Sequence, residues 1–202
     1  MQHYKKKPIY IYILILTLCS TGGLQAWRIL FDNFAVHIIH LDGHHIGIIQ
    51  SVREIPWFLS FTVIYALLLI KEQRLAAFSV LLLGAGLFIT GLLPSFQGIA
   101  FTTLIMSFGF HYFETCNQSL TLQHFSHEQA PLVFGKLRSY ASLCNIAVSV
   151  SFLFIAPYFE YSSLYLLMGG TVMLITLLTF NTFPATDSPV PQQQKMILKK
   201  QY

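Results

Sequence analysis

Ionisable and amide side chains recur at helical spacing inside a sequence that is otherwise strongly apolar. His111 and Glu114 stand three residues apart, and Asn117 follows three residues later. Residues three or four apart share one face of an α-helix, so these side chains are expected to project together. A charge at the centre of a bilayer costs about 2.5–3.5 kcal/mol on insertion scales, and such residues usually serve a substrate, ion or proton path. A glutamate beside a histidine therefore predicts a proton relay or a substrate contact.

Three further apolar segments carry polar side chains at the same spacing. Together the four stripes supply nine candidate residues for a solute pathway: Arg28, Asp32, Arg53, Glu54, His111, Glu114, Asn117, Arg138 and Asn145. A structural role is the alternative for each stripe. In that case its side chains hold helices together through hydrogen bonds or ion pairs without touching a solute.

Two opposite-charge pairs are expected between the first two apolar segments. A tight turn joining them would place Arg28 at the depth of Glu54, and Asp32 at the depth of Arg53. Buried charges need partners because their desolvation is costly, so these pairs would lock the hairpin or line the pathway. Across the hairpin formed by the fourth and fifth segments, the residues at the depth of Glu114 are neutral. This carboxyl group is therefore expected to lack a cationic partner.

The apolar segments are long enough to cross a bilayer. Hydrophobic residues make up 54% of the 202 residues and charged residues 10%, whereas a soluble domain carries roughly 25% charged residues. Segments of about 20 apolar residues span a bilayer, and six are predicted: 8–39, 46–70, 75–93, 99–125, 137–158 and 164–183. They form one bundle domain (residues 1–183), followed by a cytoplasmic linker (184–202). No room remains for a soluble catalytic domain, so the chain is not expected to be an enzyme, and no cofactor motif occurs.

The lysines and arginines favour one orientation in the membrane. Ten of the twelve lie before the first span, after the last, or in the connections after the second and fourth: Lys5, Lys6, Lys7, Lys71, Arg74, Lys136, Arg138, Lys195, Lys199 and Lys200. The other connections contain none. Cationic loops stay in the cytoplasm, so the chain is predicted to be a multi-pass protein of the cytoplasmic (inner) membrane with both termini inside. Orientation also accounts for the net charge of +4, and nucleic acid is not an expected partner.

The order of the spans predicts an internal repeat. Spans one, two, four and five carry the polar stripes, whereas spans three and six contain no ionisable side chain in their apolar cores. The order polar, polar, apolar therefore occurs twice. An odd number of spans per repeat inverts the second repeat relative to the first. The predicted fold class is an all-α membrane protein whose six transmembrane helices form a 3+3 inverted repeat.

The span order and three sequence segments resemble the N-terminal six-helix half of a major facilitator superfamily transporter. The segments are "HHIGIIQS" (His44–Ser51), "FGKLRSYASL" (Phe134–Leu143) and the linker end "KMILKKQY" (Lys195–Tyr202). The resemblance covers residues 5–202. It implies that spans one, two, four and five border a central cavity, with spans three and six peripheral. It also implies secondary active transport of a small solute by alternating access, with protons a candidate coupling ion.

A complete member of that superfamily has twelve spans, so the chain is expected to be inactive alone. It would be a fragment, a truncated product, or a half that assembles with a second six-helix half or in a parallel homodimer. The family's glycine-rich motif after the second span is absent, because "ALLLIKEQR" (Ala66–Arg74) keeps only Lys71, Glu72 and Arg74.

Two alternatives to transport follow from other features. Five potential metal ligands occur within nine residues at an outer turn: His37, His40, Asp42, His44 and His45. They would suit a membrane metal-binding protein or metalloenzyme, although their spacing matches no known site. The other alternative is a membrane scaffold that transports nothing.

Overall fold

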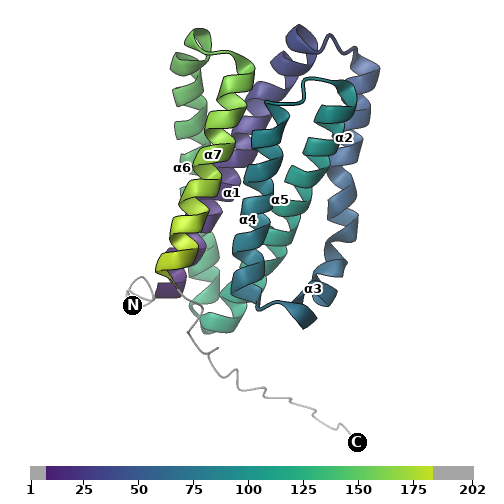
Figure 1. Ribbon diagram of the computed structural model, residues 1–202. Helices are drawn as coiled ribbons and strands as arrows, with labels where there is room; N and C mark the ends of the chain where they lie inside the picture. Colours follow the sequence, from purple (N-terminus) through teal and green to yellow (C-terminus); the bar gives the residue numbers. More distant parts are fainter. Residues whose placement is uncertain (1–7, 184–202) are drawn as a thin grey trace, which may run out of the picture.

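The computed structural model describes residues 8–183, and this part of the chain is helical with no strand (Figure 1). Six consecutive passes run along the bundle. They consist of α1 (Pro8–Asn33) with the short π-helix η2 (Phe34–Ile38); α2 (Gly43–Phe58) with the 3-10 helix η3 (Leu59–Thr62) and α3 (Val63–Leu69); α4 (Glu72–Thr90); α5 (Phe96–His124); α6 (Ala130–Ile155) with the 3-10 helix η4 (Ala156–Tyr158); and α7 (Tyr161–Thr182). The predicted linker at 184–202, the three N-terminal lysines and the three C-terminal lysines lie outside the described residues.

Five of these six passes are long and apolar enough to cross a membrane: those of α1, α2–α3, α4, α6 and α7. The remaining helix, α5, has 29 residues, which is ample length. Its histidine, glutamate, asparagine and glutamine side chains lower its hydropathy below that of the others. The prediction of an all-helical bundle of spanning helices is therefore confirmed, and α5 is its most polar member.

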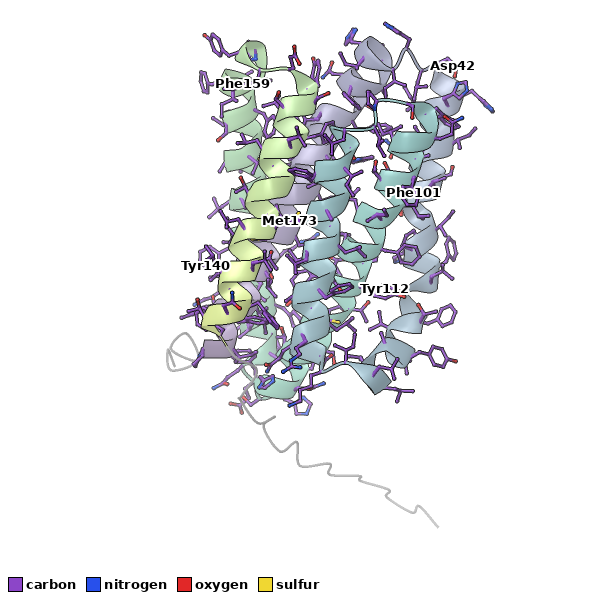
Figure 2. The ribbon with its side chains drawn as sticks, viewed as in Figure 1. Asp42, Phe101, Tyr112, Tyr140, Phe159 and Met173 are labelled. Carbon is purple, nitrogen blue, oxygen red and sulfur yellow. The ribbon has the colours of Figure 1, made fainter. Side chains whose placement is uncertain are left out.

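Successive passes run in opposite directions (Figure 1). The connections after η2, α4 and η4 lie at one end of the bundle, and Figure 2 shows Asp42 and Phe159 together at that end. The connections after α3 and α5 lie at the other end, where α1 begins and α7 finishes. Lys71 and Arg74 lie at this second end, as the charge distribution predicts.

The position of α6 corrects one predicted boundary. The fifth span was expected to begin at residue 137, which put the charges of Lys136 and Arg138 at its very start, but α6 already begins at Ala130. Pro131 is favourable here because N–H groups in the first turn of a helix have no acceptor within the helix, so the N–H that proline lacks is not missed. Arg138 therefore lies in the third turn of a helix, where it can face its neighbours.

Helix neighbours in space are not the neighbours in sequence. The central helix α4 packs against both α5 and α7, α1 packs against α6 and α7, and α2 packs against α5. Although α1 and α2 are consecutive, they do not form a packed pair in the described structure. Glycines allow the closest approaches: Gly86 lies against Met106, Gly109 against Ser79 and Leu83, and Gly169 against Gly84 and Phe88. Small residues at such crossings are typical of helix packing in membranes.

Pro56 interrupts the second pass as expected. Proline has no N–H to donate, and η3 follows it within three residues. The Ser107 hydroxyl of α5 donates a hydrogen bond to the carbonyl oxygen of Arg53, one turn before the interruption. This bond between helices provides a carbonyl near the proline with a partner.

Asp42 caps the N-terminus of α2. Its Oδ1 atom accepts a hydrogen bond from the backbone N–H of His45 at 2.9 Å and lies 2.6 Å from Nδ1 of the same residue. The backbone bond, and then the side-chain bond, lower the pKa of Asp42 below its ordinary value of 3.8. The ionised carboxylate is therefore favoured in the folded protein.

The cap should make stability depend on pH. A carboxyl group whose pKa is lower in the folded state stabilises the protein above its unfolded pKa, and this contribution is lost as the pH falls through the folded value. Asp42→Ala should therefore lower the midpoint of thermal unfolding at about pH 7, and the deficit should be smaller at an acidic pH below the ordinary pKa of 3.8. Asp42→Asn keeps a neutral cap and serves as control. A deficit for Asp42→Ala that is equal at both pH values would contradict this assignment.

Candidate functional site

A polar cavity opens between α1, α5 and α6. It consists of two adjoining spaces of about 140 Å³ and 260 Å³ that share Thr21, Phe110, Glu114, Arg138 and Ala141 in their walls. The smaller space is completed mainly by Thr17, Ser20, Phe113, Asn117, Gln118, Phe134 and Leu137. The larger is completed by Leu24, Arg28, Ser142 and Asn145. We call both together the polar cavity.

The polar cavity brings together five of the nine predicted site residues: Arg28, Glu114, Asn117, Arg138 and Asn145. They come from α1 and from the consecutive helices α5 and α6, which lie far from α1 in the sequence. The prediction from helical spacing missed Thr17 and Ser20. Both lie on α1 within about one turn before the polar residue Thr21. Extending the same helical spacing backwards from Thr21 would have found both.

Side-chain hydrogen bonds fix the register of the three helices. The Gln25 Nε2 atom donates to Ser149 Oγ at 3.0 Å, joining α1 to α6. The Cys144 thiol donates to the carbonyl oxygen of Leu18 at 3.6 Å. Between α5 and α1, Asn117 Nδ2 donates to Thr17 Oγ1 at 3.5 Å. The cavity walls are thus held by polar contacts as well as by packing.

Glu114 forms no ion pair with any residue of 8–183, as expected, but it shares the cavity with the guanidinium group of Arg138. Arg138 lines both parts of the cavity with Glu114, and its charge acts on the Glu114 carboxyl group. The two groups are not within 4.0 Å, since the ion pairs among residues 8–183 are Asp42–His45 and Arg53–Glu54. The expectation was based only on residues at the same depth as Glu114, whereas a long arginine side chain can reach across helical turns.

Two acceptor atoms in the cavity have no partner. The Oδ1 atoms of Asn117 and Asn145 are buried, and neither accepts a hydrogen bond from any described residue. A buried polar atom without a partner costs free energy of about 1–3 kcal/mol. The walls of the cavity therefore contain one carboxyl group, two asparagine amides and two guanidinium groups. This combination suits a ligand that carries both donors and acceptors.

A second charged group lies around α2, and here the predicted pairs Arg28–Glu54 and Asp32–Arg53 are wrong. Arg53 pairs instead with the adjacent Glu54 at 2.8 Å, and its guanidinium carbon lies 5.3 Å from the centre of the Trp27 ring. The equal-depth expectation assumed that α1 and α2 pack as a hairpin. Because α2 packs against α5 instead, their side chains do not meet in the predicted pairs.

The α5 stripe divides between these two groups. Glu114 lines the polar cavity, whereas His111 does not line it and lies within the electrostatic influence of Glu54 and Arg53. Asp32 is exposed and lines neither part of the cavity. His111 and Glu114 therefore do not line the polar cavity together, whereas Glu114 and Arg138 do.

The histidine-rich turn does not assemble a metal site. Across residues 8–183, no three histidine, cysteine, aspartate or glutamate side chains are placed to hold a metal ion together. His45 is engaged by Asp42 and packs edge-on against the ring of Phe96, 4.9 Å between centroids. His40 adopts a positive φ of 60° in the turn. The metal-binding alternative gains no support from this geometry.

Comparisons with known proteins leave the functional argument to the fold and the cavity. No protein-family model matches the chain, and no curated protein is significantly similar to it.

Proposed function

We propose that this chain is the six-helix half of a secondary active transporter, of the major facilitator type, that moves a small polar solute across the cytoplasmic membrane. The observation that carries this proposal is the polar cavity. Charged and amide side chains of α1, α5 and α6 converge there inside a bundle of spanning helices. Ionisable residues are expensive in a membrane and usually mark a solute or ion path. The helices α4 and α7 contribute nothing to its walls, as expected for peripheral spans, but α2–α3, which was expected to border the cavity, contributes nothing either.

The pattern of helix packing supports a 3+3 repeat. In a 3+3 repeat, α1 corresponds to α5, α2–α3 to α6, and α4 to α7. If each helix is replaced by its counterpart, the α1–α6 contact becomes the α5–α2 contact. The same exchange turns α1–α7 into α5–α4 and leaves α4–α7 unchanged, and all these contacts occur. Gly84 and Gly169, which face each other, exchange places. The most apolar stretches of the α2–α3 and α6 passes are also equally uncovered, each 11% buried. Inverted repeats of this kind are a common transporter design.

The exposed polar residues around the cavity support a need for a partner. Arg28, Asp32 and Arg138 are exposed on the isolated chain. Polar faces turned toward lipid are costly, so a second six-helix half or a second copy should cover this side. The two halves of this superfamily are related by an axis along the membrane normal, which requires a parallel assembly. Both termini then lie in the cytoplasm.

Water access to the cavity tests the proposal. Ser142 lines the polar cavity, whereas its neighbour Leu143 is exposed on the outer surface of α6. In a variant whose three native cysteines are replaced, Ser142→Cys should react with a charged, membrane-impermeant thiol reagent that is supplied to both sides of the membrane. Leu143→Cys should react at least ~10-fold more slowly, because an apolar surrounding that raises a thiol pKa by one unit removes nine-tenths of its reactive thiolate. Equally slow reaction at both positions would favour a scaffold without a solute path.

A further inference from the structure

We infer that the polar cavity binds a small zwitterion, that is, a molecule with a carboxylate and an ammonium group such as a free amino acid. This inference rests on the proposed function and specifies the solute of the same cavity. It depends on the order of charges along the cavity, on the free acceptor atoms beside Glu114, and on the cavity volume.

The register of the helices places Glu114 between two arginines. Asn117 contacts Thr17, so Glu114, one turn earlier in the antiparallel α5, lies beside the α1 residue one turn later, Ser20. Arg28 is eight residues farther along α1, which is roughly 12 Å at 1.5 Å per residue. The helix α6 runs parallel to α1, and its Cys144 contacts Leu18. Arg138 precedes Cys144 by six residues, so it lies on the side of Glu114 opposite to Arg28.

The acceptors around Glu114 match an ammonium group. An –NH₃⁺ group has three donors and no acceptor. Asn117 lines the smaller space and Asn145 the larger one, while Glu114 lines both. The two asparagine Oδ1 atoms lack partners among the described residues. Because both oxygens are closed off from solvent, each amide group must turn toward the cavity to accept from a ligand; Glu114 and the two amide oxygens can then take the three N–H groups, and the ammonium charge would offset that of Glu114.

The arginines match a carboxylate. A guanidinium group binds a carboxylate through two parallel hydrogen bonds. Arg138 forms no ion pair within residues 8–183 and lies on the cavity wall with Glu114. A simple anion would leave the acceptors near Glu114 without donors, and a simple amine would leave the arginines unmatched. Sites with polar groups left unpaired discriminate strongly against such ligands.

The cavity is also of a suitable size. Its two parts, about 140 Å³ and 260 Å³, together reach only the lower end of the range of roughly 300–1,000 Å³ typical of pockets for drug-sized ligands. A solute of few atoms fits such a space, and both charged ends of an amino acid can then reach opposite charges at once.

Ligand-induced stabilisation of the purified full chain in lipid nanodiscs tests this inference. The midpoint of thermal unfolding is measured with each of the standard amino acids, because a ligand that binds the folded state raises it. At least one should do so. Its deaminated analogue, which keeps the carboxylate, and its decarboxylated analogue, which keeps the amine, should each bind at least ~10-fold more weakly. Failure of every amino acid, or equal binding of either analogue, would overturn the inference.

Two variants connect the effect to the cavity. Glu114→Gln should weaken binding of the amino acid and reduce its preference over the deaminated analogue at least ~10-fold. Glu128→Gln removes the same charge from the exposed α5–α6 connection and should change neither quantity. An unchanged preference in a folded Glu114→Gln protein would refute the assignment of the ammonium group to Glu114. If Glu114→Gln does not fold, the two analogues decide the matter on the unmodified chain.

The two proposals can fail separately. Rapid labelling of Ser142→Cys without any amino acid binding would leave a solute path and reject the zwitterion. Slow labelling of Ser142→Cys together with no binding would reject both.

Discussion

Gly109→Ala should destabilise the bundle strongly, whereas Gly135→Ala should not. A Cβ atom at residue 109 would lie 2.4 Å from the backbone nitrogen of Leu83 and 2.4 Å from the carbonyl oxygen of Ser79. Both are backbone atoms of α4, so the helices must separate to admit the methyl group. Residue 135 has no heavy atom within 4 Å of the same position. Both glycines lie inside helices, so the intrinsic helix preference for alanine is common to the two changes.

The expected effects have opposite signs. Overpacking costs about 1–3 kcal/mol at a buried site, whereas alanine at an exposed helical site gains up to about 1 kcal/mol over glycine. Thermal unfolding of the purified chain in mild detergent should show a lower midpoint for Gly109→Ala and an equal or higher one for Gly135→Ala. Because Gly109 lies where α5 crosses α4 and not in the polar cavity, the change should affect folding rather than ligand chemistry. Similar midpoints for the two variants would contradict the close α4–α5 contact.

Single cysteines at the two ends of the bundle should be labelled from opposite sides of the membrane. Lys71 lies exposed in the connection before α4, and His44 lies exposed in the first turn of α2 at the other end. Cationic connections are retained in the cytoplasm, and Lys71 and Arg74 belong to one of them. Lys71→Cys should therefore react with an impermeant thiol reagent only in inverted vesicles, and His44→Cys only in intact cells.

This expectation is nearly all-or-none because an impermeant reagent reaches one side alone. Cys19, Cys116 and Cys144 are replaced first, so that each protein carries a single thiol. A cysteine placed at Glu128, in the α5–α6 connection, should behave as the one at Lys71 does. Labelling of Lys71→Cys in intact cells would reverse the proposed orientation, and with it the side on which the termini lie.

The start of α6 explains why the cavity contains charges of both signs. The sequence assigned Lys136 and Arg138 to the connection after the fourth span, and Arg138 was also a candidate for the solute pathway. Because α6 begins at Ala130, Arg138 is displayed on a helix opposite Glu114. The same residue can therefore contribute to orientation and to the electrostatics of the cavity. Arg53 and Glu54 form a separate charged group beside Trp27.

Several features of this protein follow from its sequence alone. Long apolar segments specify helices of spanning length, because only a helix satisfies every backbone hydrogen bond within an apolar segment. Helical periodicity then identifies faces, so Glu114, Asn117 and Asn145 could be selected as site candidates, and Pro56 could be identified as an interruption. These properties are local, since each depends on residues within a few turns of one helix.

The neighbours of each helix were decided only by the tertiary structure. Which helices touch depends on how their surfaces fit, as at Gly86, Gly109 and Gly169, where the missing side chain lets two backbones approach. Sequence order suggested that α1 pairs with α2, but α1 packs against α6 and α7. The predicted pairs of Arg28 and Asp32 with α2 therefore do not form, and Arg138 shares the polar cavity with Glu114. Depth along a helix can be counted from the sequence, but the direction in which a side chain finds its partner is set by packing between segments far apart in the chain.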